Sequence, residues 1–169
     1  MSHPFAHIFK NVFQVAYVAD DLERATRWFR DNMDTPEWTF ISGMRAVDCV
    51  VDGEPAPLWE IDVAVVNVGT TNIEIIRPVA GPVGMYADHI DSSKPATFHH
   101  LGMLVEDMEE TTASLEAYGK RWTTAFESPG FGLVAYADFS RELGHYVEAL
   151  QLAPEGKEFF ADLAKKSGY

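Results

Sequence analysis

Four polar residues interrupt apolar segments of the sequence, and their side chains could together bind a divalent metal ion. They are Gln14, Glu74, His100 and Glu148. An amide oxygen, an imidazole nitrogen and two carboxylates are suitable ligands, and the two negative charges would neutralise a divalent cation. Such a set would leave coordination positions open for water or a substrate. The sequence therefore predicts a metal site, provided that the fold brings these residues together.

The period of a β-strand places each of the four on one face of its segment. Side chains two residues apart share a face, so Gln14 lies with Val12 and Ala16, opposite Phe13 and Val15. The other three also have mostly apolar neighbours on the opposite face, and we expect that second face to carry the helices. Each residue could instead be a hydrogen-bonded core residue or a solvated surface residue. Their shared pattern favours a common site, because four unrelated explanations would otherwise be needed.

An internal repeat indicates how the fold is organised. Residues 14–29 align with residues 100–115 at a constant offset of 86. Both copies change from an apolar strand to a helix with an aspartate at its N-cap, which is Asp20 or Asp21 in the first copy and Asp107 in the second. Both halves of the chain therefore begin with a strand followed by a helix.

Three strand-like segments follow each helix, which predicts an α+β fold built from two paired βαβββ modules forming a curved mixed sheet around a central cleft. The expected strands are 38–41, 61–68 and 72–77 in the first half and 122–126, 132–137 and 145–150 in the second. The expected boundaries are 1–78 for the first module, 79–96 for a linker, 97–152 for the second module and 153–169 for a C-terminal helix. The segment 44–57 gives no clear pattern.

Pairing the two modules about a pseudo-twofold axis would gather their first and last strands around one concave surface. Gln14 and His100 are equivalent positions of the repeat, and Glu74 and Glu148 each lie in the last strand of a module. We therefore expect these four side chains to converge. His99 should point the opposite way along its strand, so we expect a structural role for it.

Charge and composition exclude several classes of function. The 169 residues include 13 Lys and Arg against 26 Asp and Glu, and the resulting net charge of −13 repels nucleic acids and anionic membrane surfaces. Apolar residues make up 47% of the chain, which is enough for a folded globular core. No segment reaches the length of a membrane span and the first nine residues do not resemble a signal peptide, so we expect a cytoplasmic protein.

The remaining candidate residues are expected to be structural. Cys49, the single cysteine, lies among valines and is expected to be a packed, unreactive thiol. The other histidines show no comparable pattern and are expected on the surface or in loops; they are His3, His7, His89 and His145.

Four stretches of the chain resemble the vicinal oxygen chelate superfamily, the group of glyoxalase I, bleomycin-resistance proteins and extradiol dioxygenases. The stretches are 14–22, 73–78, 98–107 and 144–150, and they look most similar to the methylmalonyl-CoA epimerases. The resemblance implies paired βαβββ modules with a metal ion between them, and it places metal ligands at Gln14, Glu74, His100 and Glu148. Gln14 stands where the epimerases usually have His, and Glu74 where some of them have Gln.

The resemblance also implies a chemistry. In this superfamily the metal polarises bound substrate oxygens and stabilises a developing enolate or oxyanion. The resemblance assigns proton transfer to Glu148 and to a second carboxylate, best matched by Asp62, with Glu60 as the alternative. We therefore expect a divalent-metal-dependent isomerase, epimerase or lyase that removes a proton next to a chelated carbonyl. The metal could be Zn, Ni, Co, Mn, Mg or Fe.

Two other functions of the same fold remain open. An extradiol-type dioxygenase would need two histidines and one carboxylate around Fe(II), and Gln14 in place of a second histidine disfavours it. A non-catalytic binding or resistance protein would only sequester a ligand in the cleft. For the substrate we expect a small or aromatic carbonyl compound, because the net charge of −13 disfavours the phosphates of a coenzyme A thioester.

A homodimer is the expected assembly. Paired modules would expose sheet edges and an apolar helix face, which a second copy could cover. The C-terminal helix carries an apolar stripe of Phe159, Phe160 and Leu163 that could pack on its own module or on a partner.

Overall fold

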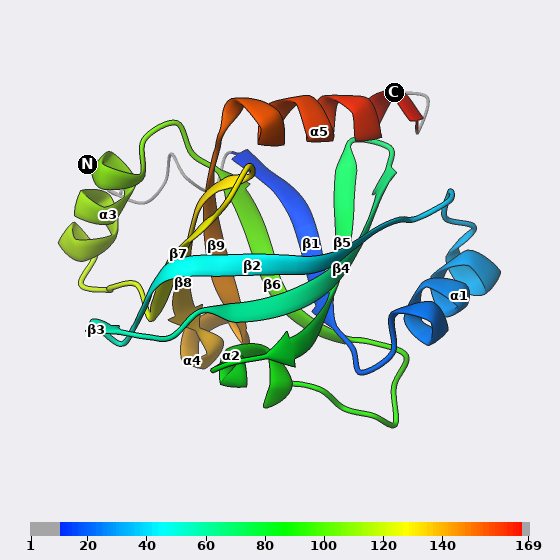
Figure 1. Ribbon diagram of the computed structural model, residues 1–169, viewed down its shortest axis with the longest axis horizontal. Coiled ribbons are helices and arrows are strands. Elements are labelled where there is room, and N and C mark those ends of the chain that lie inside the picture. Colours follow the sequence, from blue (N-terminus) through cyan, green and yellow to red (C-terminus); the bar gives the residue numbers. More distant parts are fainter. Residues whose placement is uncertain (1–10, 167–169) are drawn as a thin grey trace.

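The computed structural model describes residues 11–166, which form a mixed α+β fold with a curved, closed sheet (Figure 1). The strands are β1 Val12–Val18, β2 Thr39–Val51, β3 Glu54–Pro55, β4 Trp59–Val68, β5 Thr71–Ala80, β6 Thr97–Leu104, β7 Thr124–Ser128, β8 Gly132–Phe139 and β9 His145–Leu152. The helices are α1 Leu22–Met33, α2 Gly84–Ala87, α3 Met108–Ala117, α4 Ser140–Leu143 and α5 Pro154–Lys166.

The repeated strand and helix begin each half of the fold, and the helices start at the expected aspartates. The Asp21 carboxylate accepts a hydrogen bond from the Arg24 backbone N–H at the start of α1. Asp107 does the same for the Glu110 N–H at the start of α3. Each side chain satisfies a backbone donor that has no partner within its own helix. Of the two aspartates that the sequence left open, Asp21 is the cap.

The sheet closes on itself. Its strand order is β3-β2-β4-β5-β1-β6-β9-β8-β7, and β2 pairs with β7 in addition. Strand β1 runs parallel to β5 and antiparallel to β6, while β6 runs parallel to β9. The pairing of β2 with β7 joins the two ends of this order, so the central cleft expected from sequence is the interior of a barrel.

Strand β2 is much longer than the predicted strand 38–41. It includes part of the segment 44–57, which has no clear pattern in the sequence. Register shifts interrupt its pairing with β4 and with β7. Gly43 and Asp48 lie within it at positive φ, which bends the strand and breaks the alternation of inward and outward residues. The prediction that this strand ends at residue 41 is therefore wrong, because the bulges hide its period.

The two long internal helices cover the outside of the barrel, on the faces that strand alternation predicted. Ala25 and Phe29 of α1 pack against Ile73 and Ile75 of β5. Leu115 of α3 packs in a separate cluster with residues of β6, β8 and β9. The opposite faces of these strands are left to line the interior.

Helix α5 lies across one end of the barrel (Figure 1). Leu163 is buried, Phe159 meets the Phe131 ring edge-on at 5.2 Å between centroids, and Phe160 meets Phe13 at 5.4 Å. The apolar stripe of the C-terminal helix therefore packs on its own chain, which is one of the two arrangements expected from sequence.

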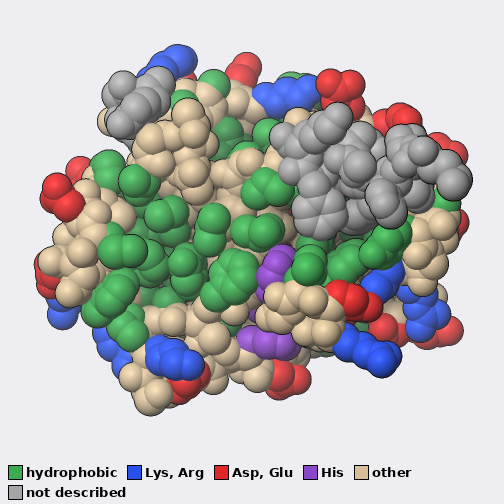
Figure 2. Space-filling view, turned by 180° about the vertical axis from the view of Figure 1, so that it is seen from behind, with side chains coloured by type: hydrophobic (Ala, Val, Ile, Leu, Met, Phe, Trp, Pro, Cys, Tyr) green, Lys and Arg blue, Asp and Glu red, His purple; other side chains and the backbone are tan. Residues whose placement is uncertain are grey.

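Figure 2 shows the side of the molecule opposite to the side seen in Figure 1, and hydrophobic side chains gather on this face. Twelve large hydrophobic side chains are exposed among residues 11–166, including Phe98, Val12 and Trp28 at 39%, 41% and 41%. No helix within the described part of the chain is long and apolar enough to cross a membrane.

Candidate active site

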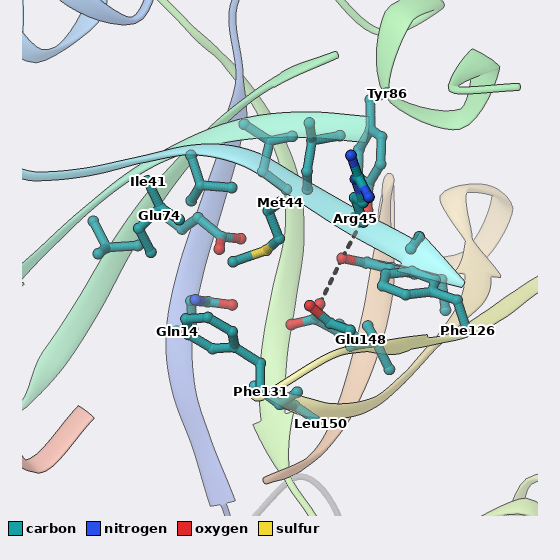
Figure 3. Close-up of a pocket in the computed structure, with 18 of the residues that line it drawn as sticks. Gln14, Ile41, Met44, Arg45, Glu74, Tyr86, Phe126, Phe131, Glu148 and Leu150 are labelled. Atoms are coloured by element: carbon teal, nitrogen blue, oxygen red, sulfur yellow. Dashed lines mark hydrogen bonds between the residues drawn. The ribbon is translucent and has the colours of Figure 1, made fainter. Parts of the chain in front are cut away.

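The barrel encloses a cavity in which Gln14, Glu74 and Glu148 point toward one another (Figure 3). About 640 Å³ of space lies between its lining atoms, part of it open to solvent. Most of the lining is apolar, including Trp59 and Phe126. A small polar cluster in an apolar cavity is the usual composition of a small-molecule site.

Strand register explains why these residues meet. Gln14 of β1 is the cross-strand partner of Gly102 in β6, and Gly102 is the partner of Glu148 in β9. In the next row, Ala16 of β1 is the partner of both Glu74 in β5 and His100 in β6. The four predicted side chains therefore lie in two adjacent rows.

The atoms that face the centre of this cluster lack hydrogen bonds. Gln14 Oε1, His100 Nε2 and Glu148 Oε2 are all buried without a partner. His100 Nε2 lies 3.5 Å from Glu148 Oε2 and 3.8 Å from Glu74 Oε2. Leaving a buried polar atom unsatisfied costs about 1–3 kcal/mol, so three of them at one point indicate that a further group completes the site.

A metal ion fits this point by distance. Two ligands at about 2.1 Å from a tetrahedral ion lie about 3.4 Å apart, which is close to the observed 3.5 Å between His100 Nε2 and Glu148 Oε2. Within residues 11–166, however, no group of three His, Cys, Asp or Glu side chains forms a candidate metal cluster. The site would depend on the amide oxygen of Gln14, and metal binding by the four residues stays a prediction.

Gly102 leaves the central space open. A Cβ atom at this position would lie 2.6 Å from Gln14 Oε1 and 3.0 Å from Glu148 Oε2. Distances below 3.0 Å are too short for ordinary packing, so any side chain would displace these atoms. Gly102 was not among the predicted site residues, although its place two residues after His100 puts it on the same face.

The two carboxylates of the cluster differ in their surroundings. Burial, and then the negative charge of Glu148, raise the pKa of Glu74 well above its usual value. Glu148 Oε1 accepts a hydrogen bond of 2.5 Å from the Tyr136 hydroxyl, whose oxygen in turn accepts one of 3.1 Å from Tyr86. The Glu74 carboxyl therefore keeps its proton to a higher pH than an ordinary glutamate does.

Both histidines of β6 are buried, with His99 1% and His100 0% exposed. Their Nδ1 atoms lie 2.9 Å apart, and His99 Nε2 lies 2.8 Å from the Met85 carbonyl oxygen. Burial, and then the neighbouring His100, lower the pKa of His99 to about 3, so its ring is neutral at physiological pH. His99 thus faces away from the cavity, as expected, but it contacts His100 directly.

The structure places Asp62 outside the cavity. Its carboxylate pairs with Arg77 and accepts a hydrogen bond of 2.8 Å from the Gly43 N–H, on the face of β4 opposite Ile61 and Val63. Glu60 shares this outer face, 4.0 Å from Arg45. Neither acid reaches the four converging side chains, so the geometry argues against the proton-transfer role that the resemblance implied.

Other residues that line the cavity were not among the predicted site residues. Tyr136 shares the inward face of β8 with Val134, and strand alternation could have identified it. Tyr86 lies in the segment predicted as a linker, where no periodic signal exists. Ser128 lines the cavity, and its buried hydroxyl has no hydrogen-bond partner. Arg45 is the basic residue that lines it.

The remaining candidates have structural surroundings. Cys49 is 4% exposed, its sulfur accepts a hydrogen bond from the Trp59 indole, and burial raises the pKa of its thiol. His89 lies near the Met85 carbonyl and His145 near that of Tyr146, and neither lines the cavity. His3 and His7 lie outside the described residues.

Solved structures share this fold at low sequence identity. Methylmalonyl-CoA epimerase from Mycobacterium tuberculosis matches with a TM-score of 0.55 and 15% identity over 88% of this chain and 91% of that one. A hypothetical protein from Bacillus halodurans matches with a TM-score of 0.57 and 11% identity over 84% and 94% of the two chains. A methylmalonyl-CoA epimerase from Streptomyces coelicolor, in complex with 2-nitronate-propionyl-CoA, matches with a TM-score of 0.54 and 12% identity over 85% and 95%.

Sequence comparison gives the family. No curated protein sequence matches the chain. The family model of the glyoxalase, bleomycin resistance protein and dioxygenase superfamily matches residues 13–137, which is most of the chain and includes Gln14, Glu74 and His100. The fold, the closed sheet and this match agree, and the chain belongs to the glyoxalase/bleomycin resistance protein/dioxygenase superfamily.

Proposed function

We propose that this protein is a divalent-metal-dependent isomerase, epimerase or lyase that removes a proton next to a carbonyl group of a small substrate. The observation that carries the proposal is the meeting of three unpartnered buried atoms, Gln14 Oε1, His100 Nε2 and Glu148 Oε2, around the open space at Gly102. Glu74 completes the ligand set. In the finer architecture that we propose, residues 1–78 and 97–152 are paired βαβββ modules that share this site.

A bound metal ion would supply Lewis-acid polarisation of substrate oxygens, which makes a neighbouring C–H group acidic. The chain supplies the rest of the site. Glu148 would accept the proton through Oε2, the oxygen that also faces the proposed metal position, because the Tyr136 O–H group holds Oε1 and stabilises the carboxylate. The apolar wall of the cavity excludes water from the reacting carbon and strengthens these interactions.

The number of carboxylic acids in the cavity limits the kinds of reaction that the site could catalyse. The inward residues of β4, namely Trp59, Ile61, Val63 and Val65, are all apolar, so this strand adds no acid to the cavity. In the part of the chain that the structure describes, Glu74 and Glu148 are the two carboxylates in the lining. An epimerisation that needs acids on both sides of the carbon would have to use these two, whereas an isomerase or a lyase needs only one.

The cavity suits a small and largely apolar substrate. Among residues 11–166, Arg45 is the one basic residue in the lining, and it lies 4.0 Å from the outward-facing Glu60 with its side chain 65% exposed, so it offers little charge to an anionic group in the cavity. Three basic residues outside the lining are paired with carboxylates: Arg77 with Asp62, Lys94 with Asp91 and Lys120 with Glu142. The coenzyme A substrates of the similar epimerases are therefore not part of the proposal.

Proton abstraction can be tested without knowing the substrate. The metal-loaded protein, incubated in D₂O with a panel of small 2-oxo and 2-hydroxycarbonyl compounds, should exchange one C–H group for deuterium, as followed by proton NMR. Glu148→Gln should abolish the exchange, and Asp62→Asn should retain it. A panel in which no compound exchanges although the protein binds metal would favour a binding or resistance protein instead. Turnover that requires oxygen would favour a dioxygenase.

A further inference from the structure

The segment between the two halves of the fold reaches the candidate site through a single helical turn. Helix α2 contains the adjacent residues Met85 and Tyr86. Each of them begins a chain of hydrogen bonds that ends at one of the four converging side chains. Tyr86 is fully buried, and its ring packs against Trp59 at 5.2 Å between centroids. This segment was expected to be only a linker.

The first chain runs from Met85 to His100. The Met85 carbonyl oxygen can only accept, so His99 Nε2, at 2.8 Å, carries a hydrogen and donates it. His99 is 1% exposed and contacts no carboxylate within residues 11–166, so burial disfavours a charge on it. Its Nδ1 is then a bare acceptor, and His100 Nδ1, at 2.9 Å, must donate to it. His100 Nε2 is therefore left with a free lone pair directed into the cluster.

The second chain runs from Tyr86 to Glu148. A carboxylate oxygen can only accept, so the Tyr136 hydroxyl donates to Glu148 Oε1 at 2.5 Å. The Tyr136 oxygen then accepts the hydrogen of Tyr86 at 3.1 Å. Glu148 Oε2 is left as the free oxygen, 3.5 Å from His100 Nε2. Both chains thus leave free atoms on the side that faces Gln14 Oε1.

We infer that α2 is a positioning element for the metal site, because it presents His100 with a bare Nε2 and Glu148 with a free Oε2. This inference rests on the proposed function. Metal ligands in proteins depend on such partners, whose loss typically weakens metal binding by 10–100-fold. Because coupling between two sites is reciprocal, metal binding should also stabilise α2.

Four variants separate the two chains. Tyr136→Phe removes the donor to Glu148, Tyr86→Phe removes only the outer hydroxyl, and His99→Leu removes the acceptor for His100. His99→Asn is the rescue variant, because its side-chain oxygen can still accept from His100 Nδ1. Tyr17→Phe is the matched control, since Tyr17 loses the same hydroxyl on the outside of the barrel, where it packs against Phe29 and Phe98.

The readout is Zn²⁺ affinity, measured by competition with a chromophoric chelator. We expect a 10–100-fold loss in Tyr136→Phe and in His99→Leu, a smaller loss in Tyr86→Phe, and binding within about threefold of the wild type in His99→Asn and Tyr17→Phe. Hydrogen exchange of the backbone amides of residues 84–89 should slow on Zn²⁺ binding to the wild type. Unchanged affinity in both Tyr136→Phe and His99→Leu would overturn the inference.

A second measurement needs neither metal nor variants. The ¹⁵N chemical shifts of the histidine rings in the metal-free wild type should show the His100 hydrogen on Nδ1 and the His99 hydrogen on Nε2. A hydrogen on His100 Nε2 would overturn the inference even if the variants fail to fold. Failure of the wild type to bind Zn²⁺ or any other divalent ion would instead overturn the proposed function, and the ¹⁵N shifts would still decide the direction of the hydrogen bonds.

Discussion

His100 Nε2 lies 3.5 Å from Glu148 Oε2, and neither atom has a hydrogen bond although both are buried. A protein interior rarely leaves a nitrogen lone pair and a carboxylate oxygen facing each other in this way. The two groups repel each other, and both have lost their contacts with water. A cation between them removes both penalties. This relationship is the basis of the metal-site proposal.

Gly102→Ala should block the site. The added Cβ would lie 2.6 Å from Gln14 Oε1 and 3.0 Å from Glu148 Oε2, so these ligands must move apart. We expect at least tenfold weaker Zn²⁺ binding, which corresponds to about 1.4 kcal/mol, as measured by chelator competition. Gly69→Ala is the control, because a Cβ added in this turn meets nothing within 4 Å, and its positive φ affects stability without touching the ligands. Equal affinity in wild type and Gly102→Ala would show that the ion does not sit beside Gly102.

The metal-free protein should lose stability as the pH rises. Burial, and then Glu148, raise the pKa of Glu74 in the folded state above its usual value of 4.5. The folded state therefore binds the proton more tightly than the unfolded state does. This contribution is fully present below about pH 4.5 and is lost as the pH rises through the raised pKa of the folded state.

Denaturant unfolding in the presence of EDTA, across a series of pH values, measures this effect. Buried His99 acts in the opposite direction, since its lowered pKa costs stability as the pH falls below the usual 6.5. The informative quantity is therefore the difference between the wild type and Glu74→Gln, which keeps the shape but cannot titrate. Parallel pH profiles for the two proteins would show that Glu74 does not hold the proton.

Asp62→Asn should affect stability and not the site. The Asp62 carboxylate pairs with Arg77 and accepts from the Gly43 N–H, on the outside of β4. Arg77 is 42% exposed, so we expect a loss of only about 1 kcal/mol in the free energy of unfolding. Zn²⁺ affinity should be unchanged within error. A large loss of affinity or of deuterium exchange would restore the catalytic role that the resemblance implied.

The sequence predicted the alternation of faces and the meeting of the four polar side chains, because both depend on strand period and on the repeat. Alternation alone also puts Asp62 on the face opposite Val63, which is the face that it occupies in the structure. The closure of the barrel could not be predicted, since the positive φ values of Gly43 and Asp48 hide the period of β2. Tyr86 could not be found either, because its role depends on where a four-residue helix packs.

A homodimer at micromolar concentration is still our expectation. Two of its original grounds are weaker, because β2 pairs with β7 and α5 packs on its own chain. The hydrophobic side chains that gather on the face shown in Figure 2 are the remaining ground. Sedimentation velocity over a concentration series should give twice the mass of one chain. A single-chain mass throughout would exclude the dimer and leave the metal site untouched.

The central claim is best tested by the metal stoichiometry of protein purified without a metal-affinity tag. Elemental analysis after loading with Zn²⁺, Ni²⁺, Co²⁺, Mn²⁺, Mg²⁺ or Fe²⁺ and removal of the excess should give one ion per chain for at least one of these metals. His100→Ala should reduce this to a trace, and His145→Ala, outside the cavity, should not. A wild type that retains none of the six ions, or equal retention by His100→Ala, would contradict the account.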